Sequence, residues 1–343
     1  MKAVVFDKEG GPENLYMGDF PVPTPGPGEI TVRVAACSIN HLDFWVLKRI
    51  PAYKTTMPHA MGADVAGLVE EIGEGVTDYR KGDAVVVDPV VSCGTCEWCG
   101  KGLDNRCESR HILGAGPLWG GYAEVVKVPA RNAVNIPKTL SMEEAAAIPV
   151  TFLTSWHMLV TQAGVNPEKI VLVLGAGSGI GSASISIARM AGARVIATAS
   201  SEDKRQKAKA LGAESVLDHT APHMAARVRE LTGGRGADIV VEHIGPVTFK
   251  ESIMSLVPGG TLVTCGATTG PEAAVELRYL FSKELTVKGA YLGTLSEFND
   301  LMDAFARKQL RPVIDSVFPV GDAAKALAHL DSRESFGKII LRH

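Results

Sequence analysis

The chain has 343 residues, of which 46% are hydrophobic and 21% are charged, and its formal net charge is −3. This length favours two domains, and the small negative charge gives no reason to expect nucleic acid or a membrane surface as a partner. We therefore expect a small-molecule substrate. No apolar run approaches the ~20 residues that span a bilayer, and no secretory signal is recognisable, so we expect a cytoplasmic protein whose cysteines are thiols or metal ligands.

The first 150 residues alternate short strand-like runs with turn signals. The runs include AVVFD, ITVRVAAC, VAGLVEEIG and AEVVKV, separated by segments rich in Pro and Gly. Many short strands at such spacing favour an antiparallel barrel or sandwich. Within this region AACSINHLDF, residues 35–44, brings together Cys37, His41 and Asp43, which are residue types that bind metals. The stretch raises the hypothesis of a catalytic metal site.

A cysteine cluster follows in SCGTCEWCGKGLDNRCE. It supplies four thiols within one loop, at Cys93, Cys96, Cys99 and Cys107. Four thiolates can close a tetrahedral site that leaves no position for a substrate, which is typical of structural zinc. The cluster therefore predicts a zinc-binding lobe over residues 90–112. An iron–sulfur cluster and free thiols are the alternatives.

From about residue 151 apolar runs alternate with helical patterns, as in IVLVLGAG, GSASISIARMAG, RVIATAS and EDKRQKAKALGA. This alternation predicts an α/β domain with a doubly wound parallel sheet over residues 151–291. Two amphipathic segments and a closing strand, GKIILR, complete the chain. We expect residues 292–343 to return to the first domain, which would then comprise residues 1–150 and 292–343.

The turn GAGSGIG follows the first strand of the parallel sheet and precedes a helix. Its glycines allow backbone N–H groups and a helix N-terminus to approach a pyrophosphate. The spacing and its context predict a dinucleotide site; its residues are Gly175, Gly177, Ser178, Gly179, Ile180 and Gly181. A glycine turn of purely structural use is the alternative.

The end of the second strand bears on the choice between NAD(H) and NADP(H). An NAD site usually has a carboxylate there for the ribose 2′-hydroxyl, whereas this chain has Ser200 and Ser201, followed by Lys204. Two serines and a lysine suit a 2′-phosphate, so NADP(H) is favoured over NAD(H). The alternatives are that Glu202 or Asp203 folds back onto the ribose, or that the basic residues form a solvated helix face.

These features together resemble the medium-chain dehydrogenase/reductase family, which includes zinc-type alcohol dehydrogenases and quinone oxidoreductases. The resemblance covers essentially the whole chain and rests on PGPGEITVRV, GADVAGLVEEIGEGV, KGDAVVV, the cysteine cluster, GGYAEVVKVPA, EEAAAIPVTFLTSW and FGKIIL, in this order. It implies a GroES-like catalytic domain, a Rossmann domain, and a cleft between them for substrate and nicotinamide. It also implies a homodimer or homotetramer, in which ELTVKGAYLG resembles the strand through which cofactor domains pair.

Alcohol dehydrogenases of this family bind a second, catalytic zinc. The three positions that match its ligands hold Asn40, Ala63 and Val150, while Cys37 lies three residues before the first of them. These residues bind zinc poorly or not at all, so we expect the catalytic zinc to be absent. Hydride transfer to a quinone or to a C=C bond conjugated with a carbonyl needs a Lewis acid less than alcohol oxidation does, because hydrogen-bond donors can hold the developing enolate.

The resemblance then implies the roles of individual residues. Asn40 and Thr154 would lie by the nicotinamide and the substrate carbonyl, and Asp43 and Asp64 would organise their surroundings. Further contacts to the cofactor are implied for the backbone of CGATTG and for the basic residue of FGKIIL, namely Gly266, Ala267 and Lys338.

Two other functions stay open at this point. One is an alcohol dehydrogenase, either zinc-free or with a substitute site made of Cys37, His41, His59 and Asp64. The other is a nucleotide-binding protein that has kept the fold and lost catalysis, since a fold alone does not guarantee activity. Tyr122 in GGYAEV is either a general acid or, as we favour, a core residue.

Overall fold

The computed structural model describes residues 1–343 and divides the chain into two compact units. Unit 1 comprises residues 1–150, 294–308 and 312–343, and unit 2 comprises residues 151–293 and 309–311. Helix α4, Pro149–Trp156, spans the boundary at residue 150, and a π-helical turn, His157–Gln162, follows it. None of the helices is both long and apolar enough to cross a lipid bilayer.

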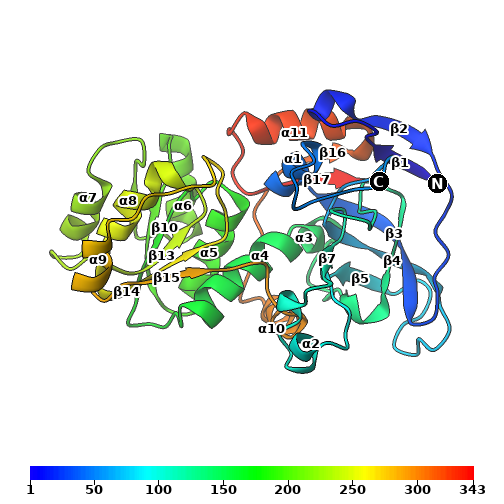
Figure 1. Cartoon of the computed structure of the whole chain (residues 1–343), viewed down its shortest axis with the longest axis horizontal. Helices are drawn as coiled ribbons and strands as arrows, with labels where there is room; N and C mark the ends of the chain where they lie inside the picture. Colours follow the sequence, from blue (N-terminus) through cyan, green and yellow to red (C-terminus); the bar gives the residue numbers. More distant parts are fainter. The chain divides into compact units, whose positions relative to one another are not determined.

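Unit 1 is built mainly from strands (Figure 1). Its strands are β1 Lys2–Val5, β2 Tyr16–Asp19, β3 Glu29–Ser38, β4 Asp64–Ile72, β5 Ala84–Val87, β6 Val90–Val91, β7 His111–Ile112, β8 Val125–Pro129, β9 Ala133–Asn135, β16 Ile314–Pro319 and β17 Lys338–Arg342. Its α-helices are α1 His41–Leu47, α2 Glu97–Gly100, α3 Met142–Ala146, α10 Leu295–Ala306 and α11 Ala323–Asp331. Short 3-10 turns occur at Pro12–Asn14, Asp104–Arg106, Ala130–Asn132 and Val320–Asp322.

The main sheet of unit 1 has seven strands, with the order β16-β17-β3-β4-β5-β9 and β8 paired with β3. Side chains of these strands are largely buried, and in β5 and β17 they are buried at consecutive positions, so parts of the sheet are covered on both faces. Phe6, Ile30, Met61 and Tyr122 are among the fully buried side chains. The C-terminal segment thus joins the N-terminal part of the chain through the pairing of β17 with β3.

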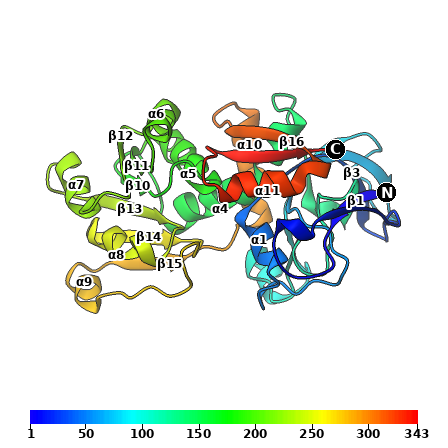
Figure 2. The ribbon, with the colours of Figure 1, turned by 90° about the horizontal axis from the view of Figure 1, so that it is seen from above.

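Unit 2 is a six-stranded parallel sheet with helices on both faces. Its strands are β10 Ile170–Val173, β11 Arg194–Thr198, β12 Ser215–Leu217, β13 Ala237–Glu242, β14 Leu256–Thr264 and β15 Thr286–Gly289, and its helices are α5 Gly179–Met190, α6 Glu202–Leu211, α7 Met224–Leu231, α8 Pro246–Met254 and α9 Leu277–Ser282. Figure 2 shows α5 and α6 on one side of the sheet and α8 on the other.

The strand order of unit 2 is β12-β11-β10-β13-β14-β15, with every neighbouring pair parallel. The direction of winding reverses between β10 and β13, and dinucleotides bind at this kind of switch point, beyond the carboxyl ends of the strands. The predicted fold class, a strand-rich GroES-like domain with a Rossmann domain, is confirmed. Buried side chains such as Leu172, Ile196, Val240 and Leu262 form the core of the sheet.

Candidate active site and metal-binding lobe

The candidate active site of unit 1 lies where three neighbouring strands begin or end. Strand β3 is antiparallel to both β4 and β17, so its last residue adjoins the starts of the other two. Ser38 pairs with Asp64 on one side and with Ile340 on the other. The sheet therefore brings together residues near positions 40, 64 and 338 that are far apart in the sequence (Figure 1).

Asn40, Asp64 and Lys338 form a buried polar cluster at this point. The Lys338 ammonium donates to the Asn40 side-chain oxygen at 2.6 Å and to the Ile39 carbonyl at 2.9 Å, and it lies 3.1 Å from Asp64 Oδ2. The Asn40 Nδ2 group donates to the same Asp64 oxygen at 2.8 Å. Asp64 also accepts from the Ser38 hydroxyl at 2.6 Å and from the Val150 N–H at 2.7 Å. The buried carboxylate is thus both ion-paired and fully hydrogen-bonded.

Asp43 supports the same loop from the first turn of helix α1. Its Oδ2 accepts from the Asn40 N–H at 2.9 Å and from the Tyr122 hydroxyl at 3.2 Å. Burial raises the pKa of Asp43 to about 7. Burial also raises the pKa of Tyr122 well above its ordinary value. Tyr122 is fully buried, which agrees with the core role that we favoured for it over that of a general acid.

The alternative metal cluster of Cys37, His41 and His59 is not assembled. Cys37 is buried, and burial raises the pKa of its thiol well above its ordinary value. The His59 ring hydrogen-bonds through Nε2 to the Gly114 carbonyl at 3.1 Å, and burial lowers its pKa to about 4. His41 is exposed on α1. Of the His, Cys, Asp and Glu side chains, only the cysteine cluster comes close enough together to hold a metal ion.

The cysteine lobe does have this geometry. The four sulfur atoms of Cys93, Cys96, Cys99 and Cys107 all lie within 4.8 Å of one another, with 3.9 Å between those of Cys93 and Cys99 and 3.6 Å between those of Cys96 and Cys99. A zinc tetrahedron with Zn–S bonds of about 2.3 Å needs sulfurs about 3.8 Å apart. Backbone N–H groups of Thr95 and Cys96 lower the pKa of the Cys93 thiol to about 6, whereas burial and contacts with the other thiols raise the pKa of the Cys96 thiol to about 11. The residues therefore fit a zinc ion.

The lobe is also tied to the rest of unit 1. Asp104, which lies between the third and fourth cysteines, accepts hydrogen bonds from the N–H of Leu295 at 3.2 Å through both carboxylate oxygens. Leu295 is the first residue of helix α10, so the carboxylate lies at the positive end of the helix dipole. The loop that carries the thiols is thereby fixed to a helix from the C-terminal part of the chain.

In unit 2 the predicted glycine turn joins β10 to α5. A Cβ atom on Gly181 would lie 2.1 Å from the Gly175 carbonyl oxygen, and Gly175 has a φ of +58°, so both positions require glycine. Ser178 caps α5 by accepting from the Gly181 N–H at 2.9 Å. Thr198, the last residue of β11, accepts from the Gly175 N–H at 3.0 Å. The close packing of backbone at a helix N-terminus fits a dinucleotide pyrophosphate.

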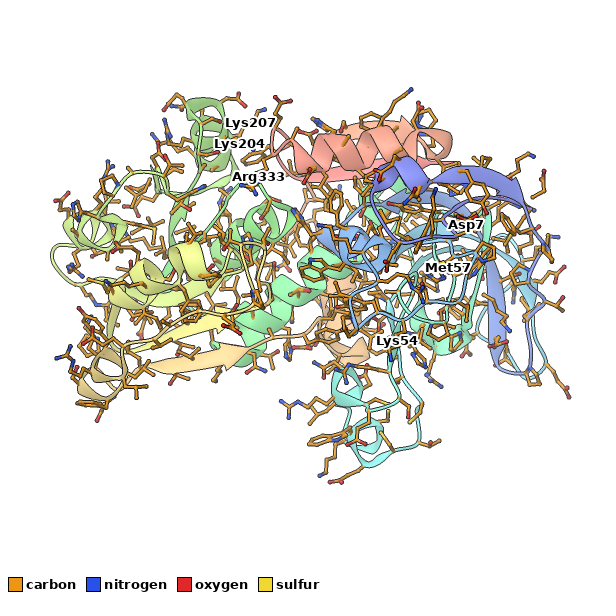
Figure 3. All side chains as sticks on the ribbon, turned by 45° about the horizontal axis from the view of Figure 1, so that its top comes forward. Asp7, Lys54, Met57, Lys204, Lys207 and Arg333 are labelled. Atoms are coloured by element: carbon orange, nitrogen blue, oxygen red, sulfur yellow. The ribbon has the colours of Figure 1, made fainter.

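The residues expected at the ribose lie between β11 and α6. Ser200 is exposed, and Ser201 caps α6 by accepting from the Lys204 N–H at 3.3 Å. The two nearby acids do not fold back toward the serines. Glu202 accepts from Arg205 at 3.0 Å, and Asp203 pairs with Lys207 at 2.9 Å, so both carboxylates are held along the helix. Lys204 and Lys207 both project from α6 (Figure 3).

Sequence reasoning missed His243, which follows the last residue of β13. Its Nε2 donates to the Leu174 carbonyl at 2.9 Å and lies 3.3 Å from the Ser178 hydroxyl, and burial lowers its pKa. The ring lies 3.2 Å from where a Cβ on Gly175 would be, so it packs against the glycine turn. The signal that could have pointed to His243 is the polar pair EH directly after the apolar run IVV. The nearby turn after β14 carries the two remaining backbone candidates, Gly266 and Ala267.

Thr154 is the other predicted catalytic residue. It lies on α4 within unit 2 and its side chain is buried. Lys338, which we expect to contact the cofactor, has its ammonium inside the Asn40 cluster of unit 1.

Two family models match the chain. The alcohol dehydrogenase GroES-like domain matches residues 26–138, and the zinc-binding dehydrogenase domain matches residues 179–307. Among relatives, quinone oxidoreductase of Sus scrofa is 30% identical over 99% of this chain and 97% of its own length, and 2-haloacrylate reductase of a Burkholderia species is 29% identical over 99% and 98%. A solved structure described as an NAD-dependent alcohol dehydrogenase superposes with a TM-score of 0.96 at 44% identity, with both chains fully covered.

The chain therefore belongs to the medium-chain dehydrogenase/reductase family, as its sequence features suggested. It is an oxidoreductase of a small-molecule substrate.

Proposed function

We propose that the protein is an NADP(H)-dependent reductase of a quinone or of a C=C bond conjugated with a carbonyl, and that it works without a catalytic zinc. The observation that carries this proposal is the Asn40 cluster. Asn40 stands at the position of the first catalytic zinc ligand, and its amide is hydrogen-bonded to Asp64 and to Lys338. Ala63 and Val150 stand at the other two ligand positions and have apolar side chains.

When bound, NADPH would supply a hydride. As a new C–H bond forms at the β-carbon of an enone, the C=C electron pair shifts toward the carbonyl and negative charge develops on its oxygen. Asn40 has one side-chain N–H that is not used by Asp64, and this group can donate to the oxygen as the charge forms. A proton from water then completes the bond at the α-carbon. Thr154 is proposed as a further catalytic residue, and Gly266 and Ala267 as backbone contacts of the cofactor.

The proposed preference for NADP(H) is supported by Ser200, Ser201 and Lys204. The two acids of the first turn of α6 are held by Arg205 and Lys207, so neither repels a 2′-phosphate from this turn. Replacing Lys204 by Gln should weaken NADPH binding by about tenfold through the loss of one charged hydrogen bond. The dissociation constant of NADH should stay unchanged. Lys207→Gln, on the same helix but paired with Asp203, is the matched control.

We also propose one structural zinc per chain, bound by the four cysteines, because their sulfur atoms have the spacing that a zinc tetrahedron needs. A further proposal is a homodimer or homotetramer. Strand β15 ends the sheet of unit 2, all of its residues are exposed, and an unpaired strand edge favours pairing with another copy. Light scattering of the purified protein measures the number of copies.

The alternative activity is alcohol dehydrogenation, which is favoured by the 44% identity to a protein described as an NAD-dependent alcohol dehydrogenase. Metal analysis combined with a substrate panel distinguishes the two. We expect one zinc per chain and NADPH-dependent turnover of enones or quinones, with little oxidation of alcohols. Two zinc atoms per chain, with alcohol oxidation lost on removal of the labile one, would rule out the proposed reductase.

A further inference from the structure

We infer that Lys338 is a positioning residue for Asn40: its ammonium fixes which way the Asn40 amide points and polarises it, so that an N–H group is always presented to the substrate oxygen. The inference rests on the proposed function, in which Asn40 contacts that oxygen. It assigns Lys338 to the reducing site, whereas the family resemblance led us to expect it at the cofactor.

The first observation behind this inference is the position of the Lys338 ammonium. The Lys338 side chain is only 4% exposed, although lysine is among the residues least often buried. An ammonium has three N–H donors, and here it has three acceptors, namely the Ile39 carbonyl at 2.9 Å, Asn40 Oδ1 at 2.6 Å and Asp64 Oδ2 at 3.1 Å. With these contacts made, no donor is left for a cofactor phosphate.

The orientation of the Asn40 amide follows from its two neighbours. In the observed orientation the amide oxygen faces a positive charge and the amide NH2 group faces a negative one. Rotating the amide by 180° would put its NH2 group against the ammonium and its oxygen against the carboxylate, so both hydrogen bonds would become repulsive contacts. Hydrogen bonds to charged groups are stronger than those between neutral groups, so the reversed amide is strongly disfavoured.

The same contacts strengthen Asn40 as a donor. Chains of hydrogen bonds polarise one another, and an amide whose oxygen accepts from an ammonium has more positive N–H groups. The negative charge that forms on the substrate oxygen is therefore stabilised by Asn40 directly and by Lys338 through it. Because Asp64 balances the charge of Lys338, the ion pair buries no net charge in the substrate-free protein.

A simpler role for Lys338 would be to neutralise the buried Asp64. Lys338→Met alone would leave that carboxylate unpaired, and Asp64→Asn alone would leave the ammonium unpaired; either change is strongly destabilising. The test therefore makes Asp64→Asn and Lys338→Met together, which removes both charges at once. This paired substitution is made with and without Asn40→Ala, which gives a double-mutant cycle between position 40 and the ion pair.

We expect the paired substitution to lower kcat for an enone by about 10- to 100-fold relative to the wild type, because a positioned donor contributes only in the transition state. The KM for the enone and the dissociation constant of NADPH should change less than about threefold, as a role in uniform binding is not invoked. Lys338→Arg, which keeps the cation, should keep part of the rate. In a protein that already carries Asn40→Ala, the paired substitution should have little further effect.

Thermal unfolding of each variant establishes that it is folded. Equal losses of kcat from the paired substitution with and without Asn40→Ala would overturn the inference, since independent effects add. A large rise in the NADPH dissociation constant would also overturn it and return Lys338 to the cofactor. If the wild-type protein reduces no quinone or enone in the panel, the proposed function fails and this inference fails with it. If the wild type is active and the losses are additive, the inference alone fails.

Discussion

The cysteine lobe and the Asn40 cluster are the two places where the family resemblance led us to look for a metal, and they differ in how their charges are arranged. The lobe brings four thiols together within a short loop, with their sulfurs within 4.8 Å of one another. The Asn40 cluster contains a cation, Lys338, beside an anion, Asp64. The first arrangement fits a metal ion, whereas in the second a side-chain ammonium already balances the carboxylate.

Among the variants that test this difference, we expect the removal of one thiol from the lobe to have the largest effect. Cys96→Ser should lower the zinc content from about one per chain to near zero, and the melting temperature should fall by roughly 10 °C, because structural zinc contributes several kcal/mol to folding. Metal analysis and thermal unfolding measure the two effects. Cys265→Ser, outside the lobe, should keep the zinc. Full zinc content in the Cys96→Ser protein would mean that the metal is bound elsewhere.

In the Asn40 cluster, the corresponding substitution is Asn40→Ala. We expect kcat for an enone to fall by about 10²- to 10³-fold, as when one donor is removed from an oxyanion site, with the zinc content unchanged. Steady-state kinetics and metal analysis measure both. His41→Ala, the exposed neighbour, should retain both the activity and the zinc. A loss of metal from either variant would restore the hypothesis of a second zinc in this loop.

Asp43 provides a further test of the Asn40 cluster that involves no metal, because the titration of its carboxyl should appear in the pH dependence of stability. Its pKa is about 7 in the folded protein, against about 4 in an unfolded chain. Between these values the native carboxyl keeps a proton that the unfolded chain has lost, so the free energy of unfolding falls as pH rises, by up to about 1.4 kcal/mol per pH unit. The decrease should end near pH 7.

Asp43→Asn keeps an oxygen that can accept from the Asn40 N–H and the Tyr122 hydroxyl but removes the titration. Urea unfolding between pH 5 and pH 8 should therefore show a smaller decrease of stability with pH in Asp43→Asn than in the wild type. Asp303→Asn, at an exposed carboxyl, is the control that should follow the wild type. Parallel curves for Asp43→Asn and the wild type would show that Asp43 is ionised throughout.

The smallest expected effect concerns how the lobe is attached. Asp104→Ala removes the acceptor for the first N–H of α10 and should cost about 1 kcal/mol in the free energy of unfolding, as other helix caps do. The zinc content should not change, because Asp104 is not a ligand. Glu108→Ala, an exposed acid of the same lobe, is the control. Loss of zinc from Asp104→Ala would mean that the attachment to α10 is needed to assemble the thiols.

Features that depend on neighbouring residues could be predicted from the sequence, whereas contacts that depend on strand pairing could not. The fold class is confirmed because strand and helix patterns are local, and the cysteines and the glycine turn are recognisable because their residues are close neighbours in the chain. The position of Lys338 depends on the pairing of β17 with β3, which no local pattern reveals. His243 was missed for the same reason, since its contact with the glycine turn depends on β13 lying beside β10. The roles of Asn40 and Thr154 stay predictions.

The proposed cofactor residues lie on separate connections, which has a consequence for evolution. The glycine turn lies between β10 and α5, where Gly181 tolerates no side chain, whereas Ser200, Ser201 and Lys204 lie on the next connection and the first turn of α6. Mutations in the second connection leave the first intact. If these residues select the coenzyme as we propose, a lineage can exchange one nicotinamide coenzyme for the other in a few steps while the glycine turn stays unchanged.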